Sequence, residues 1–116
     1  MVKESSGKLL DLGEGISFEI TAERVNKLAS RREYEGIVHH PGKGTPAIPD
    51  FRVKFSEKIG VDPSRVYVRY LKTTYGIGMS RTRIHVYDTA EAARQFEPKY
   101  IIDRNKTLEE EIAEAE

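Results

Sequence analysis

Apolar and polar residues alternate along four stretches of the chain: residues 16–22, 32–39, 65–70 and 82–87. This period of two is typical of a strand with one buried face. Gly36 interrupts the second stretch, and a glycine inside a strand weakens it or marks a bulge. The pattern predicts four strands.

Two further segments have the spacing of helices. Between Ile48 and Ile59 apolar side chains recur every three or four residues, behind prolines that suit a first turn, and Gly60 follows at the end. Residues 90–96 are rich in alanine and follow Thr89, a capping residue. The predicted order is therefore strand, strand, helix, strand, strand, helix.

This order, ββαββα, favours the α+β class, with a four-stranded antiparallel sheet and two main helices packed on it. A single domain would cover residues 16–105. The polar, glycine-punctuated residues 1–15 are expected to form a flexible N-terminal arm. The acidic residues 106–116 are expected to form a disordered tail.

The last two strands are expected to form a hairpin around Gly76, which would place their odd-numbered residues on one face. Tyr70 would lie on the other, buried face. Clustered arginines and tyrosines suit contacts with phosphates and bases, although such side chains can also simply spread into water. The residues of the odd-numbered face are Arg65, Tyr67, Arg69, Arg81, Arg83, His85 and Tyr87.

Charge is distributed unevenly along the chain, and this bears on which partners the protein can bind. The formal net charge is zero, with 19 basic and 19 acidic residues. Thirteen basic and five acidic residues fall within 24–83, a net charge of +8, whereas residues 1–23 and 84–116 carry −3 and −5. This asymmetry hints at a polyanionic partner for the middle of the chain, unless folding interleaves the charges.

Composition narrows the class of protein. An apolar fraction of 38% and a charged fraction of 33% suit a globular domain with a modest core. No apolar run is long enough to span a membrane, and the N-terminus lacks the apolar segment of a signal peptide. There is no cysteine, so disulfides and thiol chemistry are excluded. We expect a cytoplasmic protein without membrane contact.

No motif indicates catalysis or a cofactor. Lys43 lies in a Gly-Lys-Gly-Thr sequence, but the spacing is not that of a phosphate-binding loop. His39 and His40 are neighbours on a strand and point to opposite faces, and His85 stands alone. We therefore expect surface or strand-end histidines, no metal site, no enzyme, no cofactor and no small-molecule substrate.

A set of short motifs occurs in an order and at a spacing that resemble one family. Over roughly residues 16–105 the chain resembles small-subunit ribosomal protein number twenty-four of the "e" class, shared by archaea and eukaryotes. The acidic tail departs from the lysine-rich extension of eukaryotic members and indicates the archaeal type. The motifs are Asn26–Leu28, Arg31–Arg32, His40–Thr45 with the helix behind it, Thr73–Gly76, Val86–Asp88 and Glu97–Tyr100.

The resemblance implies a structural, RNA-binding constituent of the small ribosomal subunit, located on cytoplasmic ribosomes and taking part in translation. Its partners would be the ribosomal RNA of that subunit and neighbouring ribosomal proteins, and the isolated chain would be a monomer. Eight residues at matching positions or on the hairpin face are candidates for RNA contact: Arg31, Arg32, Lys43, Arg69, Lys72, Tyr75, Arg81 and Arg83.

Two other functions stay open. A free-standing module could bind single-stranded RNA, with Tyr67, Tyr75 and Tyr87 as stacking platforms. A protein-interaction module could use the acidic tail to recruit a basic partner.

Overall fold

The computed structural model describes residues 2–3, 8–73 and 78–106. The strands of this part are β1 (Val2–Lys3), β2 (Lys8–Gly13), β3 (Ile16–Asn26), β4 (Arg31–His39), β5 (Val66–Thr73) and β6 (Met79–Tyr87). The helices are α1 (Ile48–Ile59), the short 3-10 helix η1 (Pro63–Arg65), α2 (Ala90–Phe96) and α3 (Lys99–Asn105). The α+β class is confirmed. The count of four strands and two helices is too low, because β1, β2 and α3 are additional elements.

All the strands belong to one antiparallel sheet, in the order β1-β3-β4-β6-β5, with β2 paired to β3 outside this path. The sequence predicts a flexible arm up to residue 15, whereas Lys8–Gly13 form β2. The turn behind β2 explains the difference, since Gly13, Glu14 and Gly15 all have positive φ. Glycine-rich composition is compatible with a tight hairpin turn as well as with a flexible chain.

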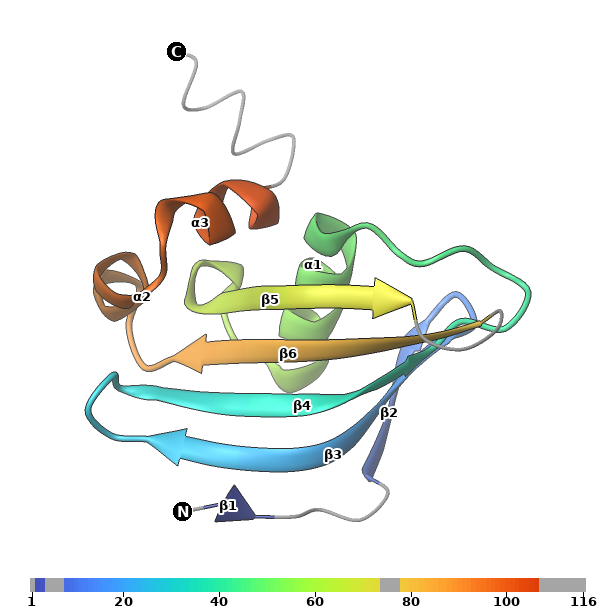
Figure 1. The fold of residues 1–116 in the computed structure, drawn as a ribbon, viewed down its shortest axis with the longest axis horizontal. Helices are drawn as coiled ribbons and strands as arrows, with labels where there is room; N and C mark the ends of the chain where they lie inside the picture. The colour runs from blue at the N-terminus through green and yellow to red at the C-terminus, as the bar shows by residue number, and fades with distance from the viewer. Residues whose placement is uncertain (1, 4–7, 74–77, 107–116) are drawn as a thin grey trace.

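Helix α1 covers one face of the sheet, the inner face, and lies behind β5 and β6 in Figure 1. The apolar spacing that predicted this helix also forms its buried side. Phe51 and Phe55 are fully buried, and both rings pack edge-on against Phe18, with centroids 5.8 and 5.6 Å apart. The helix ends at Gly60, whose φ of 73° lies in the left-handed region that glycine adopts readily.

Helices α2 and α3 cover one end of the opposite, outer face of the sheet. Tyr67 and Tyr87 are buried there against Ala93 and Ile101, with only 6% and 0% of their surface exposed. His85 lies beside them and is also buried. The prediction that these three side chains share an open basic face is therefore wrong, because α2 and α3 pack over this end of the sheet.

The pairing of β3 with β4 contains a bulge at Thr21, directly beside Gly36. A side chain at Gly36 would have no room, since a Cβ atom there would lie 2.0 Å from the carbonyl oxygen of Glu19. The glycine therefore allows the two backbones to approach closely, and it marks a bulge, one of the two possibilities that the sequence left open.

Two buried polar side chains fix the helices to β5. Arg52 of α1 is 1% exposed; it donates hydrogen bonds to the carbonyl oxygens of Val66, Asn105 and Pro63. The amide of Asn105 accepts from the N–H of Val68 at 2.8 Å and donates to its carbonyl oxygen at 2.9 Å. These hydrogen bonds set the position of α3 on the sheet. None of the helices in the described residues is long and apolar enough to cross a membrane.

Candidate nucleic-acid interface

The β5–β6 hairpin starts in the predicted register and then leaves it. Val68 pairs with Ile84 as expected, but a bulge at Arg69 shifts the next pair, so that Tyr70 lies opposite Arg83. One extra residue in a strand reverses the alternation of side chains beyond it. Tyr70 therefore lies on the outer face, not on the buried face as predicted, and Arg69 does not lie directly opposite Arg83.

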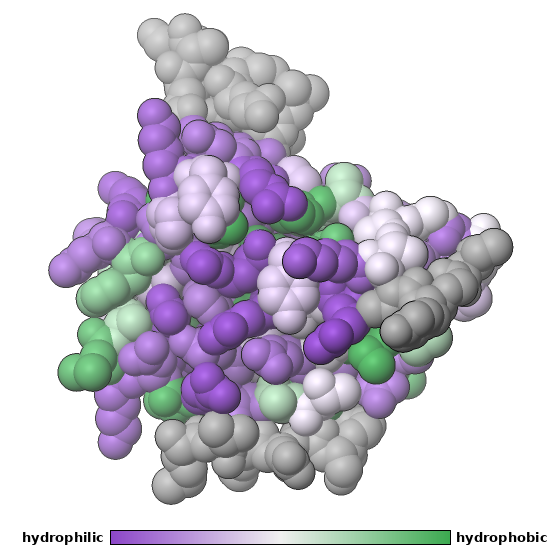
Figure 2. Space-filling model, in the orientation of Figure 1, coloured by the Kyte–Doolittle hydropathy of each residue, from purple (hydrophilic) through white to green (hydrophobic). Residues whose placement is uncertain are grey.

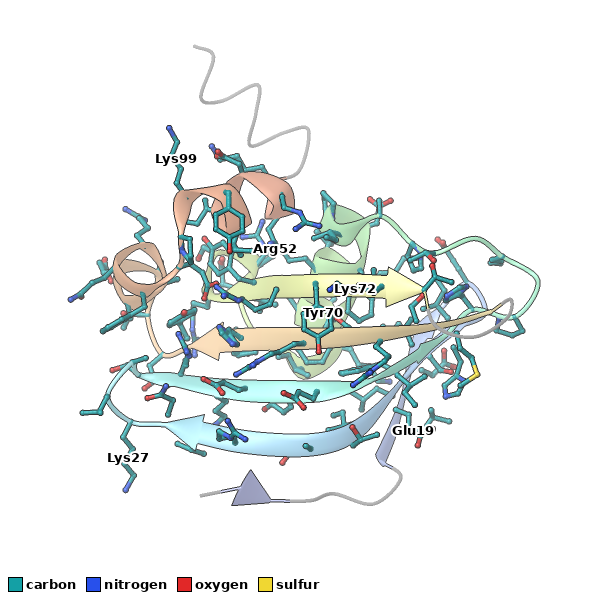
Figure 3. All side chains as sticks on the ribbon, viewed as in Figure 1. Glu19, Lys27, Arg52, Tyr70, Lys72 and Lys99 are labelled. Carbon is teal, nitrogen blue, oxygen red and sulfur yellow. The ribbon has the colours of Figure 1, made fainter. Side chains whose placement is uncertain are left out.

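The same shift brings Lys72 directly opposite Arg81 on the outer face. Both side chains are exposed. Figure 3 shows Tyr70 and Lys72 close together on this face of the β5–β6 pair, and the Lys72 ammonium lies 5.4 Å from the centre of the Tyr70 ring. Two like charges directly opposite each other are unfavourable unless an anion or solvent separates them.

Arg31 and Arg83 converge on a buried carboxylate that sequence reasoning missed. Arg31 Nε donates to Glu33 at 2.8 Å, and Arg83 Nη2 donates to its other oxygen at 3.0 Å. Burial by itself would raise the pKa of Glu33, but these hydrogen bonds and one from Asn26 lower it to about 2. The two arginines are therefore held by an ionised carboxylate in the middle of the outer face.

A second buried carboxylate, Glu97 at the end of α2, holds Arg69. Arg69 Nη1 donates to Glu97 at 2.7 Å, His85 Nδ1 lies 3.0 Å from its other oxygen, and the Tyr87 hydroxyl donates to that same oxygen. Burial opposes ionisation, yet these three partners together lower the pKa of Glu97 to about 2. The same burial raises the pKa of Tyr87 well above its usual value and lowers that of His85.

Tyr87 joins the two carboxylate clusters, because its hydroxyl also accepts a hydrogen bond from Arg31 Nη1 at 2.9 Å. One continuous polar network thus runs from β4 through β6 to α2. Two buried nitrogen atoms of this network, Arg83 Nε and His85 Nε2, have no hydrogen-bond partner among the described residues. The hydrogen bonds that do form restrict the positions of the side chains. Arg31, Arg69 and Arg83 are therefore held in place on the outer face, each still partly exposed.

The outer face has two hollows that meet at Arg83. One lies at the β3–β4 turn and is lined by Arg24, Val25, Asn26, Lys27, Leu28, Arg31, Glu33 and Arg83. The other lies between α3 and the β5–β6 pair and is lined by Arg69, Tyr70, Lys72, Arg83, Tyr100, Ile101 and Arg104. The basic residues of both hollows, together with Arg81, are called the outer basic surface below. Figure 2 shows this face, which is largely hydrophilic over the middle of the sheet.

Of the eight candidate residues, Arg31, Arg69, Lys72, Arg81 and Arg83 come together on the outer basic surface. The other three are Arg32, Lys43 and Tyr75. Arg32 follows Arg31 on an unbroken stretch of β4 and so faces the opposite side of the sheet, where it is exposed. Tyr75 lies outside the described residues.

Lys43 belongs to a turn on a different part of the molecule. Its ammonium donates to the carbonyl oxygen of Glu14 in the β2–β3 turn. His40 holds this turn, since its ring nitrogens lie 2.9 Å from the carbonyl oxygen of Lys43 and 2.7 Å from the Ser80 hydroxyl. His40 is 1% exposed, so it is not a surface residue, but it directly follows the end of β4, as expected of a strand-end histidine. The expectation is wrong for His85, which is buried within β6.

Sequence reasoning also missed Tyr100 and Arg104, the two residues that α3 contributes to the second hollow. Both are exposed. The sequence contains only a weak indication of this helix, because Lys99–Asn105 form just two helical turns after Pro98. Their position on the outer face depends on the packing of α3, which a local pattern does not reveal.

Comparison with known proteins agrees with the resemblance of the motifs. The family model described as ribosomal protein S24e matches residues 16–106. Proteins named small ribosomal subunit protein eS24 match from Pyrobaculum arsenaticum, 45% identical over 101 residues (83% of this chain and 84% of the relative), and from Saccharolobus solfataricus, 34% identical over 105 residues (90% and 85%). A third, from Pyrobaculum aerophilum, is 40% identical over 89 residues, covering 77% of this chain and 74% of the relative. The chain therefore belongs to the ribosomal protein S24e family, in its archaeal type, as a structural protein of the small ribosomal subunit and not an enzyme.

Proposed function

We propose that this protein binds ribosomal RNA of the small subunit through the outer basic surface, beside neighbouring ribosomal proteins, and takes part in translation as a structural constituent. The basic middle region of the sequence supplies most of that surface. Family membership supports the ribosomal setting, and the charged outer face supports the site of RNA contact.

The observation that carries the proposal is the pair Lys72 and Arg81. The two cations lie directly opposite each other across β5 and β6, both are exposed, and neither forms an ion pair with a carboxylate of the described residues. Such an arrangement costs stability in the free protein and is relieved when a phosphate lies between the charges. The RNA backbone carries a phosphate at every nucleotide and is the commonest target of such basic side chains.

The two fixed arginines beside this pair add a second reason. Arg69 and Arg83 are held by Glu97 and Glu33, so their remaining N–H groups are presented in a set orientation. A pre-positioned guanidinium loses little side-chain entropy when it binds a phosphate. On β5 and β6 the outer basic surface therefore combines two orientated arginines with two cations that form no ion pair within the described part of the chain.

The structure gives less support than the sequence did to the hypothesis of a free-standing module that binds single-stranded RNA. Of its three proposed stacking platforms, Tyr67 and Tyr87 are buried beneath α2 and α3, and Tyr75 lies outside the described residues. Of the tail needed for the protein-interaction module, residues 106–116, all but Lys106 lies outside them too.

The test is the salt dependence of binding to a folded small-subunit RNA fragment. The double variant Lys72→Ala with Arg81→Ala should bind more weakly and should reduce the log–log salt slope by about 1.4 to 1.8, since each phosphate that is no longer neutralised removes about 0.7 to 0.9. The matched control is Lys58→Ala with Arg94→Ala, two exposed basic residues of α1 and α2 that do not line either hollow. An unchanged slope in the first variant, or an equal loss in the control, contradicts the proposal.

A further inference from the structure

The hollow between α3 and the β5–β6 pair differs from the rest of the outer basic surface. It has a volume of about 320 Å³, near the lower end of the range of about 300 to 1,000 Å³ for small-molecule sites. Four basic side chains and two tyrosines line it, with Ile101, and no carboxylate is among the lining residues. This space suits a group the size of one nucleotide and is too small for a double helix.

The two tyrosines offer ring surface inside a basic hollow. Tyr100 projects from α3 with 60% of its surface exposed, although a tyrosine on a short helix could have packed against the sheet. The bulge at Arg69 turns Tyr70 out of the core and into the same hollow, where it is partly exposed. Exposed aromatic rings beside cations are the usual means by which proteins stack unpaired bases, since each base has a π face.

The four cations of the hollow divide into two kinds. Arg69 and Arg83 are paired with Glu97 and Glu33, carboxylates that lie outside the lining of the hollow. Lys72 and Arg104 are exposed, and neither forms an ion pair with a carboxylate of the described residues. The hollow therefore has two arginines held in fixed positions and two exposed cations, without an ion pair among residues 2–3, 8–73 and 78–106, that can move to contact a phosphate.

We infer that this hollow holds a single unpaired nucleotide of the bound RNA, with its base stacked on Tyr100 or Tyr70 and its phosphate held by Lys72 and Arg104. The inference rests on the proposed function and adds to it. Phosphate contacts alone would anchor any RNA backbone, whereas this hollow selects RNA that has a base outside the stack. Recognition by stacking is tolerant of base identity, so any of the four bases is suitable.

The experiment compares two RNA hairpins that are identical except for one bulged nucleotide in the stem. The full-length chain should bind the bulged hairpin about tenfold more tightly than the paired one, because stacking of a base on an aromatic ring has about this effect. Tyr100→Ala should remove the preference for the bulged hairpin, whereas Tyr100→Phe should keep the preference because the ring remains. Phe96→Ala, which removes a partly exposed ring of α2 outside the hollow, is the matched control and should keep the preference.

The outcomes separate this inference from the proposed function. Equal binding of the two hairpins by the unaltered chain, or a preference that survives in Tyr100→Ala and Tyr70→Ala, overturns the nucleotide site while the RNA-binding surface stands. Loss of the preference in Tyr100→Phe overturns stacking, because only the hydroxyl has been removed. If neither hairpin is bound at low salt, the proposed function itself fails.

Discussion

Acid should destabilise this protein by protonating the buried carboxylates on its outer face. The contribution of one of them, Glu97, can be measured separately. The side chain of Glu97 is fully buried, and its partners hold its pKa at about 2, against an ordinary value of 4.5. Each pKa unit corresponds to about 1.4 kcal/mol, so the ionised carboxylate contributes on the order of 3 kcal/mol to stability at neutral pH.

The sign follows from proton binding. The unfolded chain takes up a proton at Glu97 near pH 4.5, whereas the folded chain takes it up only near pH 2. The contribution is therefore complete above about pH 4.5 and is lost as the pH falls toward 2. Glu33, with a pKa of about 2 for the same kind of reason, should lose its contribution over the same range.

The variant Glu97→Gln isolates the first of these contributions. It leaves Arg69 without its anionic partner, which should lower the free energy of unfolding at pH 7 by about 3 kcal/mol. It should also make the decline between pH 5 and pH 2 shallower, while Glu33, Glu14 and Asp62, whose pKa values are also lowered by their partners, continue to contribute to it. Both are measured by urea denaturation at a series of pH values.

Glu57→Gln is the control, because Glu57 is an exposed residue of α1 that forms no ion pair with the described residues. It removes one negative charge from the chain and should leave both the stability and its pH dependence unchanged. If Glu97→Gln shows the same decline with acid as the unaltered chain, the partners of this carboxylate do not hold it ionised, which refutes the assignment of acid sensitivity to Glu97.

Two further substitutions test the packing that positions the site. Arg52→Lys should cost about 2 to 4 kcal/mol, because an ammonium cannot reach three carbonyl oxygens at once and leaves buried acceptors unpaired; a cost below about 1 kcal/mol in urea denaturation would contradict this. Gly36→Ala should lower the melting temperature strongly, since its Cβ would lie 2.0 Å from the Glu19 carbonyl oxygen, whereas Gly44→Ala, with nothing within 4 Å of a Cβ, should have little effect. Similar melting temperatures for the two alanine variants would show that the strands separate at little cost.

The strands and the first helix were predictable because burial follows simple periods. β3, β4, β5 and β6 each include a stretch with alternating apolar residues, and α1 has its buried phenylalanines at helical spacing. β2 was not predicted because the clearest sequence feature near it, the glycine-rich turn that follows, is also typical of a flexible chain. α3 was missed because it is short and is held mainly by Asn105 and Arg52, whose buried hydrogen bonds have no periodic pattern.

The candidate site was predictable in composition but not in arrangement. Arg31, Arg69, Lys72, Arg81 and Arg83 of the outer basic surface were all expected to bind RNA, whereas its other basic residues, Arg24, Lys27 and Arg104, were not among the candidates. The bulge that turns Tyr70 outward occurs at Arg69, with no glycine or proline to signal it. The pairing of Arg69 with Glu97 joins residues 28 positions apart, and it depends on how α2 packs on the sheet. Local pattern therefore indicates which charges are present, and tertiary packing decides which of them remain free.

The position of Asn105 has a consequence for the exposed border of the sheet. β5 is the last strand in the sheet order, so one side of its backbone would be open to a strand from another molecule. At this border Arg52 donates a hydrogen bond to the carbonyl oxygen of Val66, and the side chain of Asn105 forms hydrogen bonds with both the N–H and the carbonyl oxygen of Val68. During synthesis this border stays available for unwanted strand pairing until residue 105 has joined the fold. We expect the last turn of α3 to protect the newly made chain from pairing with another copy at this border, and the same turn adds Arg104 to the hollow beside β5.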